Sequence, residues 1–362
     1  MSELPDRNFE RIAGFRSVRI ERIKTAGGVI SMPRMTLGSV RCEEGEKTSG
    51  YIEVATRVDG TPLGYPIAVV CGKSDGPVLL IDGAIHGDEH EGTLAIAEMA
   101  RELDPGKLKG VFVGVPVMNV SAFAAMSRGN PRDLHSHDMN RFYPGRPKGY
   151  LTERIADHHN KTVGSVADLE LTIHSGGNIC YLAETIFTAT GDAASFELAR
   201  AMGTGWEILL DVPRALGSPM AAMMEQGKTA ITVELGGCAA TMPGAFRHNV
   251  DTLKKAFYNV CRHYKMIDGE AEYAPGYWRG RQQVVIASKS GMLEPNPAMP
   301  LSKSIQKGER LMRITDLFGE PVEDLHAPCD GVLFGFRTYP SVTAGDWTLF
   351  CGDATYESAD AP

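Results

Sequence analysis

The sequence lacks the cysteine pairs that hold zinc or build a disulfide framework. Its seven cysteines are scattered along 362 residues, without a Cys-x-x-C spacing and in an odd total. This distribution argues against a cysteine zinc knuckle and against a set of structural disulfides. We therefore expect reduced thiols that pack as small apolar side chains. The cysteines are Cys42, Cys71, Cys180, Cys238, Cys261, Cys329 and Cys351.

Long apolar runs and clusters of basic residues are also missing. No apolar stretch approaches the roughly 20 residues of a membrane span, and the first residues lack the apolar core of a signal peptide. The sequence thus predicts a cytoplasmic protein without a membrane segment. A formal net charge of -8, with no Lys/Arg cluster to offset it, argues against nucleic acid as a partner. A small molecule is the expected binding partner.

The pattern of apolar residues predicts an α/β sheet followed by a smaller all-β region. A single core stops growing at roughly 250 to 300 residues, so a chain of 362 residues is expected to form more than one domain. We divide it into an N-terminal segment (1–50), an α/β domain (51–272) and a β domain (273–362). Strands are expected at 51–58, 66–71, 78–82, 110–117, 167–173 and 229–235, and helices at 94–103, 152–163, 193–202 and 251–266. From residue 278 onward, only short strands between Gly/Pro turns are expected.

A polar loop interrupted by glycine follows the expected strand 78–82. It carries His86, Asp88, Glu89 and His90 directly before an expected helix. Because a buried strand fixes the backbone, polar side chains at its carboxyl end are well placed to bind a metal ion. The spacing also fits H-x-x-E-H, a helical zinc motif in which two histidines bind and the glutamate is the base. Glycines at positions 83, 87 and 92 favour the loop, in which Asp88 would accept a hydrogen bond from a ligand histidine.

Two other expected strands also end in polar side chains next to glycine. His174 follows the strand 167–173, and Glu234 lies near the end of the strand 229–235. Together with His86 and Glu89, they supply two imidazoles and a carboxylate for an open zinc site, and a separate carboxylate as general base. Each residue alone would more often be a hydrogen-bonded structural residue, but three such strand ends in one domain favour a site.

A long polar loop, 119–148, contains further candidates, and loops of this length are usually functional. The guanidinium fork of Arg141 suits a carboxylate, and the permanent charge of arginine suits the oxyanion of a tetrahedral intermediate. His135 and His137 are expected to be solvated loop residues. His158 and His159 are expected on the surface of a helix.

Four motifs in order carry a resemblance to a known family. They are His86-x-x-Glu89, Asp138-Met-Asn140-Arg141, His174-Ser-Gly-Gly and Thr232-Val-Glu234-Leu-Gly-Gly. Over roughly residues 66–266, this combination resembles the succinylglutamate desuccinylase/aspartoacylase family of the zinc carboxypeptidase superfamily. The resemblance implies a three-layer α/β/α catalytic domain with a mixed sheet and one Zn2+ per chain.

The resemblance also implies roles for the residues of these motifs. Glu234 would be the catalytic carboxylate, while Asn140 and Arg141 would hold the substrate carboxylate. The implied zinc ligands are His86, Glu89 and His174.

An arginine upstream of the Asn-Arg motif would polarise the scissile carbonyl, and Arg128 matches its position. The segment from Arg128 to Asp138 is longer than is usual in the family and contains a second arginine, Arg132. The sequence therefore leaves open which of these two arginines has the role.

The C-terminal region resembles the barrels of biotinyl and lipoyl modules. It has no Met-Lys-Met or Asp-Lys-Ala turn to carry a cofactor, so we expect a barrel-sandwich domain without the acceptor lysine. In the desuccinylase relatives, a β domain leans over the site and limits it to small substrates. This is also its expected role here.

The resulting prediction is a zinc-dependent amidohydrolase that removes an acyl group from a small N-acyl amino acid. Residues 145–156 resemble the branch that includes deacetylases of N-acetyl-diaminobutyrate. The sequence does not identify the acyl group or the amino acid. It leaves open a metallocarboxypeptidase that acts on peptides and a non-catalytic metabolite-binding protein on the same scaffold. It is compatible with a homo-oligomer but does not decide the oligomeric state.

Overall fold

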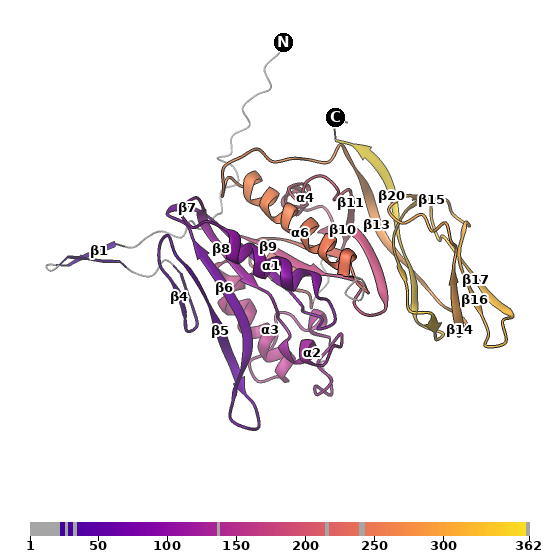
Figure 1. The fold of residues 1–362 in the computed structure, drawn as a ribbon, viewed down its shortest axis with the longest axis horizontal. Helices are drawn as coiled ribbons and strands as arrows, with labels where there is room; N and C mark the ends of the chain where they lie inside the picture. The colour runs from indigo at the N-terminus through magenta and orange to yellow at the C-terminus, as the bar shows by residue number, and fades with distance from the viewer. Residues whose placement is uncertain are drawn as a thin grey trace, which may run out of the picture.

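One large mixed sheet runs through the molecule (Figure 1). The computed structural model describes residues 22–25, 28–31, 35–135, 138–213, 217–238 and 243–359. Within these residues, twelve strands form the sheet in the order β15-β18-β20-β13-β11-β10-β12-β9-β7-β8-β6-β5. Their bounds are β5 Lys47–Thr56, β6 Pro62–Cys71, β7 Ser74–Gly83, β8 Lys109–Val115, β9 Leu169–His174, β10 Cys180–Ala189, β11 Ile208–Val212, β12 Thr229–Gly236, β13 Gly276–Ile286, β15 Ser304–Ile305, β18 Gly331–Arg337 and β20 Trp347–Ser358.

The centre of the sheet is parallel. β9 pairs in parallel with both β7 and β12, and β7 pairs in parallel with β8. Every residue of β9 is buried, as expected for a parallel strand that is covered on both faces. In this register, His174 lies opposite Glu234, and Ile173 lies opposite Gly83. The carboxyl ends of β7, β9 and β12 therefore meet at one edge of the sheet.

Helices cover both faces of the sheet because successive side chains of its strands point to opposite faces. Leu79 and Ile81 of β7 share a core with α1 (Glu91–Glu102), α4 (Ala193–Arg200) and α6 (Pro243–His263). Leu80 lies in a second core with α3 (Leu151–Thr162) and α5 (Pro219–Glu225). Figure 1 shows α1 and α6 side by side in front of the sheet. This arrangement confirms the predicted mixed α/β fold.

The C-terminal region consists of strands in its described part, as predicted, and its strands extend the central sheet. β13 pairs in parallel with β11, and β18 pairs with the amino end of β10. A second sheet has the order β17-β16-β14-β19 and comprises β14 (Gly291–Pro295), β16 (Arg310–Thr315), β17 (Pro321–His326) and β19 (Ser341–Val342). Leu311, Ile314 and Leu325 of this sheet share a core with Leu333 and Leu349 of the large sheet. The two sheets thus pack face to face at the end of the molecule that Figure 1 shows on the right.

The N-terminal segment contributes two hairpins in its described part. β1 (Arg22–Thr25) pairs with β2 (Gly28–Ser31), and β3 (Met35–Leu37) pairs with β4 (Val40–Cys42). The remaining residues before position 35, namely 1–21, 26–27 and 32–34, lie outside the described residues. The divisions at residues 50 and 272 stay predictions, although strands on both sides of residue 272 belong to one sheet.

The described chain contains neither disulfides nor a helix that could span a membrane. None of the seven cysteines, all of which lie in the described part of the chain, forms a disulfide, and all except Cys238 are buried. None of the helices in the described ranges is long and apolar enough to cross a membrane.

Several elements had no clear sequence signal. The sequence predicted neither β10 and β11 nor α5, and α2 (Val120–Ala124) lies in what was expected to be a loop. β11 has only three consecutive apolar residues, and the polar Glu184 and Thr185 interrupt β10. Helix α6 begins at Pro243 and therefore extends the predicted helix, 251–266, toward the N-terminus.

Helices α1 and α6 are joined by a charged contact at their exposed edge. Glu98 accepts hydrogen bonds from Arg247 Nη1 at 2.7 Å and from Lys254 Nζ at 2.8 Å. The bond from Arg247, followed by the bond from Lys254, lowers the pKa of Glu98 to about 2.

Because the folded protein favours ionised Glu98, this contact should stabilise the protein above the ordinary pKa of 4.5 and lose its effect as the pH falls toward 2. We expect Glu98→Gln to lower Tm near neutral pH, and we expect this difference in Tm to shrink as the pH falls from about 5 toward about 2. Thermal unfolding of both proteins across this range measures the difference. Glu102→Gln is the matched control. Of the two basic residues of α6 that contact Glu98, Glu102 forms an ion pair only with Lys254, at 2.8 Å. A Tm difference that does not change with pH would contradict the prediction.

Candidate metal centre and active site

The segment that carries His86 and Glu89 is a loop. β7 ends at Gly83 and α1 begins at Glu91, so the helical zinc motif H-x-x-E-H is wrong for this chain. His90 does not join the other two side chains, and its ring lies 5.1 Å from the ring of Phe123.

Gly87 allows this loop to lie directly against α2. A Cβ atom at Gly87 would lie 2.0 Å from the carbonyl carbon of Ala122 and 2.2 Å from the backbone nitrogen of Phe123. Only glycine fits such a close approach of two backbones. The sequence of the loop thus determines where His86 and Glu89 project.

Three ligand-type side chains meet at the strand ends. His86 Nδ1 lies 2.8 Å from Glu89 Oε1, and His174 Nδ1 lies 2.9 Å from Glu89 Oε2. The two Nδ1 atoms are 3.2 Å apart, and all three side chains are buried. Ligands bound to zinc at ~2.0 to 2.1 Å would stand about 3.3 Å apart in a tetrahedron. The spacing of these side chains therefore fits a small metal ion.

The charges around this group favour a cation. Burial alone would lower the pKa of His86, but Glu89 and Asp138 outweigh burial and raise it. At His174, burial dominates and lowers the pKa. Burial would raise the pKa of Glu89, but the two imidazoles hold it well below its usual range. Glu89 is therefore ionised, and a metal cation between the three side chains would stabilise its charge further.

Asp138 contacts the ring nitrogen of His86 that faces away from Glu89. Its Oδ1 lies 3.0 Å from His86 Nε2, and its Oδ2 accepts a hydrogen bond from Arg128 Nε at 3.2 Å. Burial acts to raise the pKa of Asp138, but the bond with His86 and the charge of Arg128 keep it well below its usual range. The expectation that Asp88 orients a ligand histidine is wrong, because Asp88 accepts a hydrogen bond from the backbone of Asn178.

Glu234 lies beside this group on β12 and lines the same cavity. Its Oε2 is buried without a hydrogen-bond partner among the described residues. Burial and then Glu89 raise the pKa of Glu234 well above its usual range, while Arg128 acts in the opposite direction. A carboxyl group with a raised pKa can accept and return a proton near neutral pH.

The structure separates the two candidate arginines. Arg128 lines the cavity, and its Nη1 lies 3.7 Å from Glu89 Oε1. Arg132 is exposed and does not belong to the described lining of that cavity. Asn140 and Arg141 also line it, and the Asn140 Oδ1 atom is buried without a partner in the described chain. The predicted site residues are thus brought together around one cavity.

The cavity has a volume of about 870 Å³ and two unlike sides. The candidate metal centre and the arginines form one side. The C-terminal region supplies much of the remaining lining, including Phe334 and Arg337 of β18, Trp347 and Phe350 of β20, and Asp346 directly before β20. No sequence pattern indicated these residues, because they join the site only when β18 and β20 extend the central sheet.

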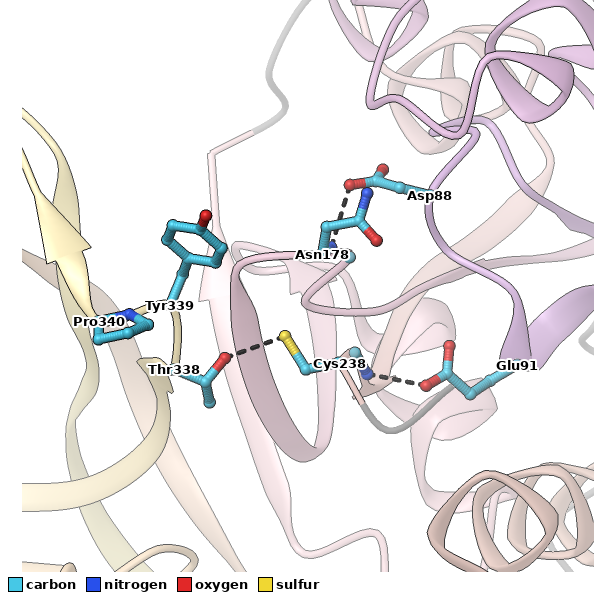
Figure 2. Close-up of a pocket in the computed structure, with 9 residues that line it drawn as sticks. Asp88, Glu91, Asn178, Cys238, Thr338, Tyr339 and Pro340 are labelled. Atoms are coloured by element: carbon cyan, nitrogen blue, oxygen red, sulfur yellow. Dashed lines mark hydrogen bonds between the residues drawn. The ribbon is translucent and has the colours of Figure 1, made fainter. Parts of the chain in front are cut away.

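A second, smaller cavity of about 390 Å³ lies outside the first, where the C-terminal region meets the loops that follow β7 and β9. Figure 2 shows Thr338 facing Cys238, with Thr338 Oγ1 and Cys238 Sγ 2.9 Å apart. Glu91 Oε1 accepts a hydrogen bond from the backbone nitrogen of Gly237 at 2.8 Å. These contacts connect the start of α1 and the C-terminal strands to the end of β12.

The remaining histidines divide between surface and core. His135 is exposed, as expected, with its ring 5.5 Å from the ring of Tyr150, and His137 lies outside the described residues. The expectation of a surface position is wrong for His159, which is only 1% exposed. The helix α3 turns this histidine toward the sheet.

The fold and the site define a class of protein that the comparisons with known proteins identify. Residues 75–264 match the sequence profile of the succinylglutamate desuccinylase/aspartoacylase catalytic domain. The chain belongs to this family, as its four motifs predicted.

Individual relatives cover most of the chain. N-alpha-acetyl-L-2,4-diaminobutyric acid deacetylase of Halomonas elongata is 30% identical over 313 residues, which are 82% of this chain and 89% of the relative. The product-bound structure of the ectoine utilization protein EutE (DoeB) from Ruegeria pomeroyi has a TM-score of 0.76 at 26% identity and covers 89% of this chain and 98% of its own. A succinylglutamate desuccinylase from Silicibacter sp. TM1040 has a TM-score of 0.75 at 25% identity and covers 90% of this chain and 98% of its own.

The close contact at Gly87 generates a prediction for the loop. A side chain there must push the loop off the backbone of α2, so we expect Gly87→Ala to destabilise the protein by roughly 1 to 3 kcal/mol. Urea unfolding measures this free energy. Gly244→Ala is the matched control, because a Cβ atom at Gly244 would meet no other side chain or strand within 4 Å among the described residues. Equal stabilities of the two variants would contradict the prediction.

Proposed function

We propose that the protein is a zinc-dependent hydrolase that cleaves the amide bond of a small N-acyl amino acid. The observation that carries this proposal is the convergence of His86, Glu89 and His174 beside Glu234 in one cavity. Relatives that are named as a deacetylase and a desuccinylase support amide hydrolysis as the reaction.

Zinc fits the donor set of this site. Two imidazoles and a carboxylate are a usual set of three protein ligands for catalytic zinc, and they leave one position for water or substrate. Asp138 fixes the orientation of the His86 ring through its second nitrogen. When bound, zinc would lower the pKa of a water molecule and polarise the substrate carbonyl.

Glu234 is the proposed general base and acid. Its raised pKa and unpartnered Oε2 suit a carboxyl group that takes a proton from the attacking water and returns it to the leaving amine. Because Glu234 lies next to His174 in register, both side chains face the same point of the cavity.

Arg128, Asn140 and Arg141 are the proposed polar contacts of the substrate. The charge of Arg128 lies at the candidate metal centre, where it would stabilise the oxyanion of the tetrahedral intermediate. Asn140 and Arg141 lie next to each other in the cavity lining and would bind the substrate carboxylate, which a planar guanidinium suits.

The C-terminal strands are proposed to limit the size of the substrate. Phe334 and Phe350 put apolar surface opposite the charged side of the cavity, and such a wall displaces water from the reaction. The relative from Halomonas elongata makes N-acetyl-2,4-diaminobutyrate the first substrate to test.

We expect the zinc-loaded protein to hydrolyse at least one member of a panel of N-acetyl and N-succinyl amino acids that includes N-acetyl-2,4-diaminobutyrate. Glu234→Gln should lower kcat by roughly 10²- to 10⁴-fold, because the reaction loses its proton carrier. Release of the amine measures the rate, and elemental analysis should find unchanged zinc in the variant.

Glu184→Gln is the control, since this half-buried carboxylate lies on the neighbouring strand β10 and does not line the cavity. Substantial residual turnover by Glu234→Gln would contradict the role of Glu234. Hydrolysis of blocked dipeptides alone would instead indicate a carboxypeptidase. Thermal stabilisation by the panel without any product would indicate a binding protein.

The positions of the two arginines generate a second prediction. Arg128→Gln should lower kcat by roughly 10²- to 10³-fold, because it removes a charge that acts on the transition state. Arg132→Gln should stay within about twofold of the wild type. Steady-state kinetics with matched zinc contents compares the variants. The assignment is wrong if Arg132→Gln has the larger effect.

A further inference from the structure

A second group of ionisable side chains lies deep in the core and has no part in the proposed reaction. Asp82 comes from β7, Glu170 from β9 and His159 from α3, and none of them is more than 1% exposed. One ligand-type atom from each residue lies within 4.8 Å of those from the other two. The surrounding core contains Leu80 and Ile155 together with the buried hydroxyl groups of Tyr143 and Thr172.

The sheet register explains how these side chains meet. Asp82 lies opposite Thr172, and Leu80 lies opposite Glu170, so both carboxylates are on the same face of neighbouring parallel strands. Helix α3 covers this face, and His159 is its buried polar residue at that level.

The group has unused hydrogen-bonding capacity. The four carboxylate oxygens of Asp82 and Glu170 are buried and accept no hydrogen bond from an N–H group of the described chain, although the two carboxyl groups lie within hydrogen-bond reach of each other and Asp82 also lies within reach of Thr172. His159 Nδ1 lies 3.1 Å from the hydroxyl of Tyr143, whereas His159 Nε2 is buried and unpartnered. Tyr143 thus orients the ring and leaves Nε2 available as a ligand, as partners of ligand histidines usually do.

The charges of the group require compensation. Two adjacent carboxylates cannot both remain ionised in an apolar core without a positive charge beside them. Burial raises the pKa of Asp82 to about 7, and burial together with Asp82 raises the pKa of Glu170 well above its usual range. A divalent cation would neutralise both carboxylates at once.

We propose that Asp82, His159 and Glu170 bind a second divalent cation, separate from the candidate zinc centre. Two carboxylate oxygens and one imidazole nitrogen form a mixed donor set that suits Mn²⁺ and Zn²⁺. The ion would join α3 to β7 and β9 below the strand ends that carry His86 and His174. Its role would be structural, and the proposal does not depend on amide hydrolysis.

The test begins with a variant that lacks the candidate zinc centre. His86→Ala/His174→Ala, prepared with Mn²⁺ or Zn²⁺ and dialysed against metal-free buffer, should retain about one cation per chain by elemental analysis. Adding Asp82→Asn and Glu170→Gln to it should remove the cation. Glu153→Gln in the same background is the matched control, because it removes another buried carboxylate near α3 and should keep the cation.

Thermal unfolding supplies a second measurement. Mn²⁺ or Zn²⁺ should raise the Tm of His86→Ala/His174→Ala by roughly 5 °C and should not change the Tm once Asp82 and Glu170 are replaced. If the combined variant does not fold, the single variants Asp82→Asn and Glu170→Gln in that background take its place. A folded His86→Ala/His174→Ala protein without bound cation and without a Tm shift overturns the proposal.

Discussion

The buried carboxylate of Glu89 between two imidazole rings is the interaction on which the rest of the site depends. An ion in this position is stable only if its charge is compensated, and the two histidines approach it from the loop after β7 and from the end of β9. The parallel register of β7, β9 and β12 brings those strand ends together and sets Glu234 beside His174. The sheet therefore does more than support the site, because a shift of one residue in β9 would turn His174 to the opposite face.

The same electrostatic logic extends outward from this carboxylate. Asp138 accepts from His86 and from Arg128, so that charges of alternating sign surround the candidate metal centre. The C-terminal strands then place aromatic side chains across the cavity, and such apolar surface strengthens every charge interaction that it shields from water. Extension of the sheet into the C-terminal region thus affects the chemistry as well as the shape of the site.

The sequence revealed those site residues that stand at ends of strands with clear apolar patterns. His86, Glu89, His174 and Glu234 were found in this way, because parallel strands end at a common edge and the three glycine-rich ends occur in one domain. Asp138 was not found as the partner of His86, since a contact across 52 positions depends on how the long loop folds back. The burial of His159 was missed for a related reason. On a polar helix such as α3, the identity of the buried face depends on what the helix covers.

The buried face of β9 shows why these two polar groups belong together. Glu170, Thr172 and His174 alternate along this strand, so all three point to the same face of the sheet and form a polar row in a parallel strand that would ordinarily be apolar. A row of this kind destabilises the fold unless each polar group is compensated. At the lower level, beside Glu170 and Thr172, the neighbouring strand β7 supplies Asp82. At the upper level, beside His174, the loop that follows β7 supplies His86 and Glu89. The charges of His86, Glu89 and His174 compensate one another, and these side chains line the cavity. The lower level, Asp82 and Glu170, does not line the cavity, and the proposed cation would compensate its two carboxylates within the core.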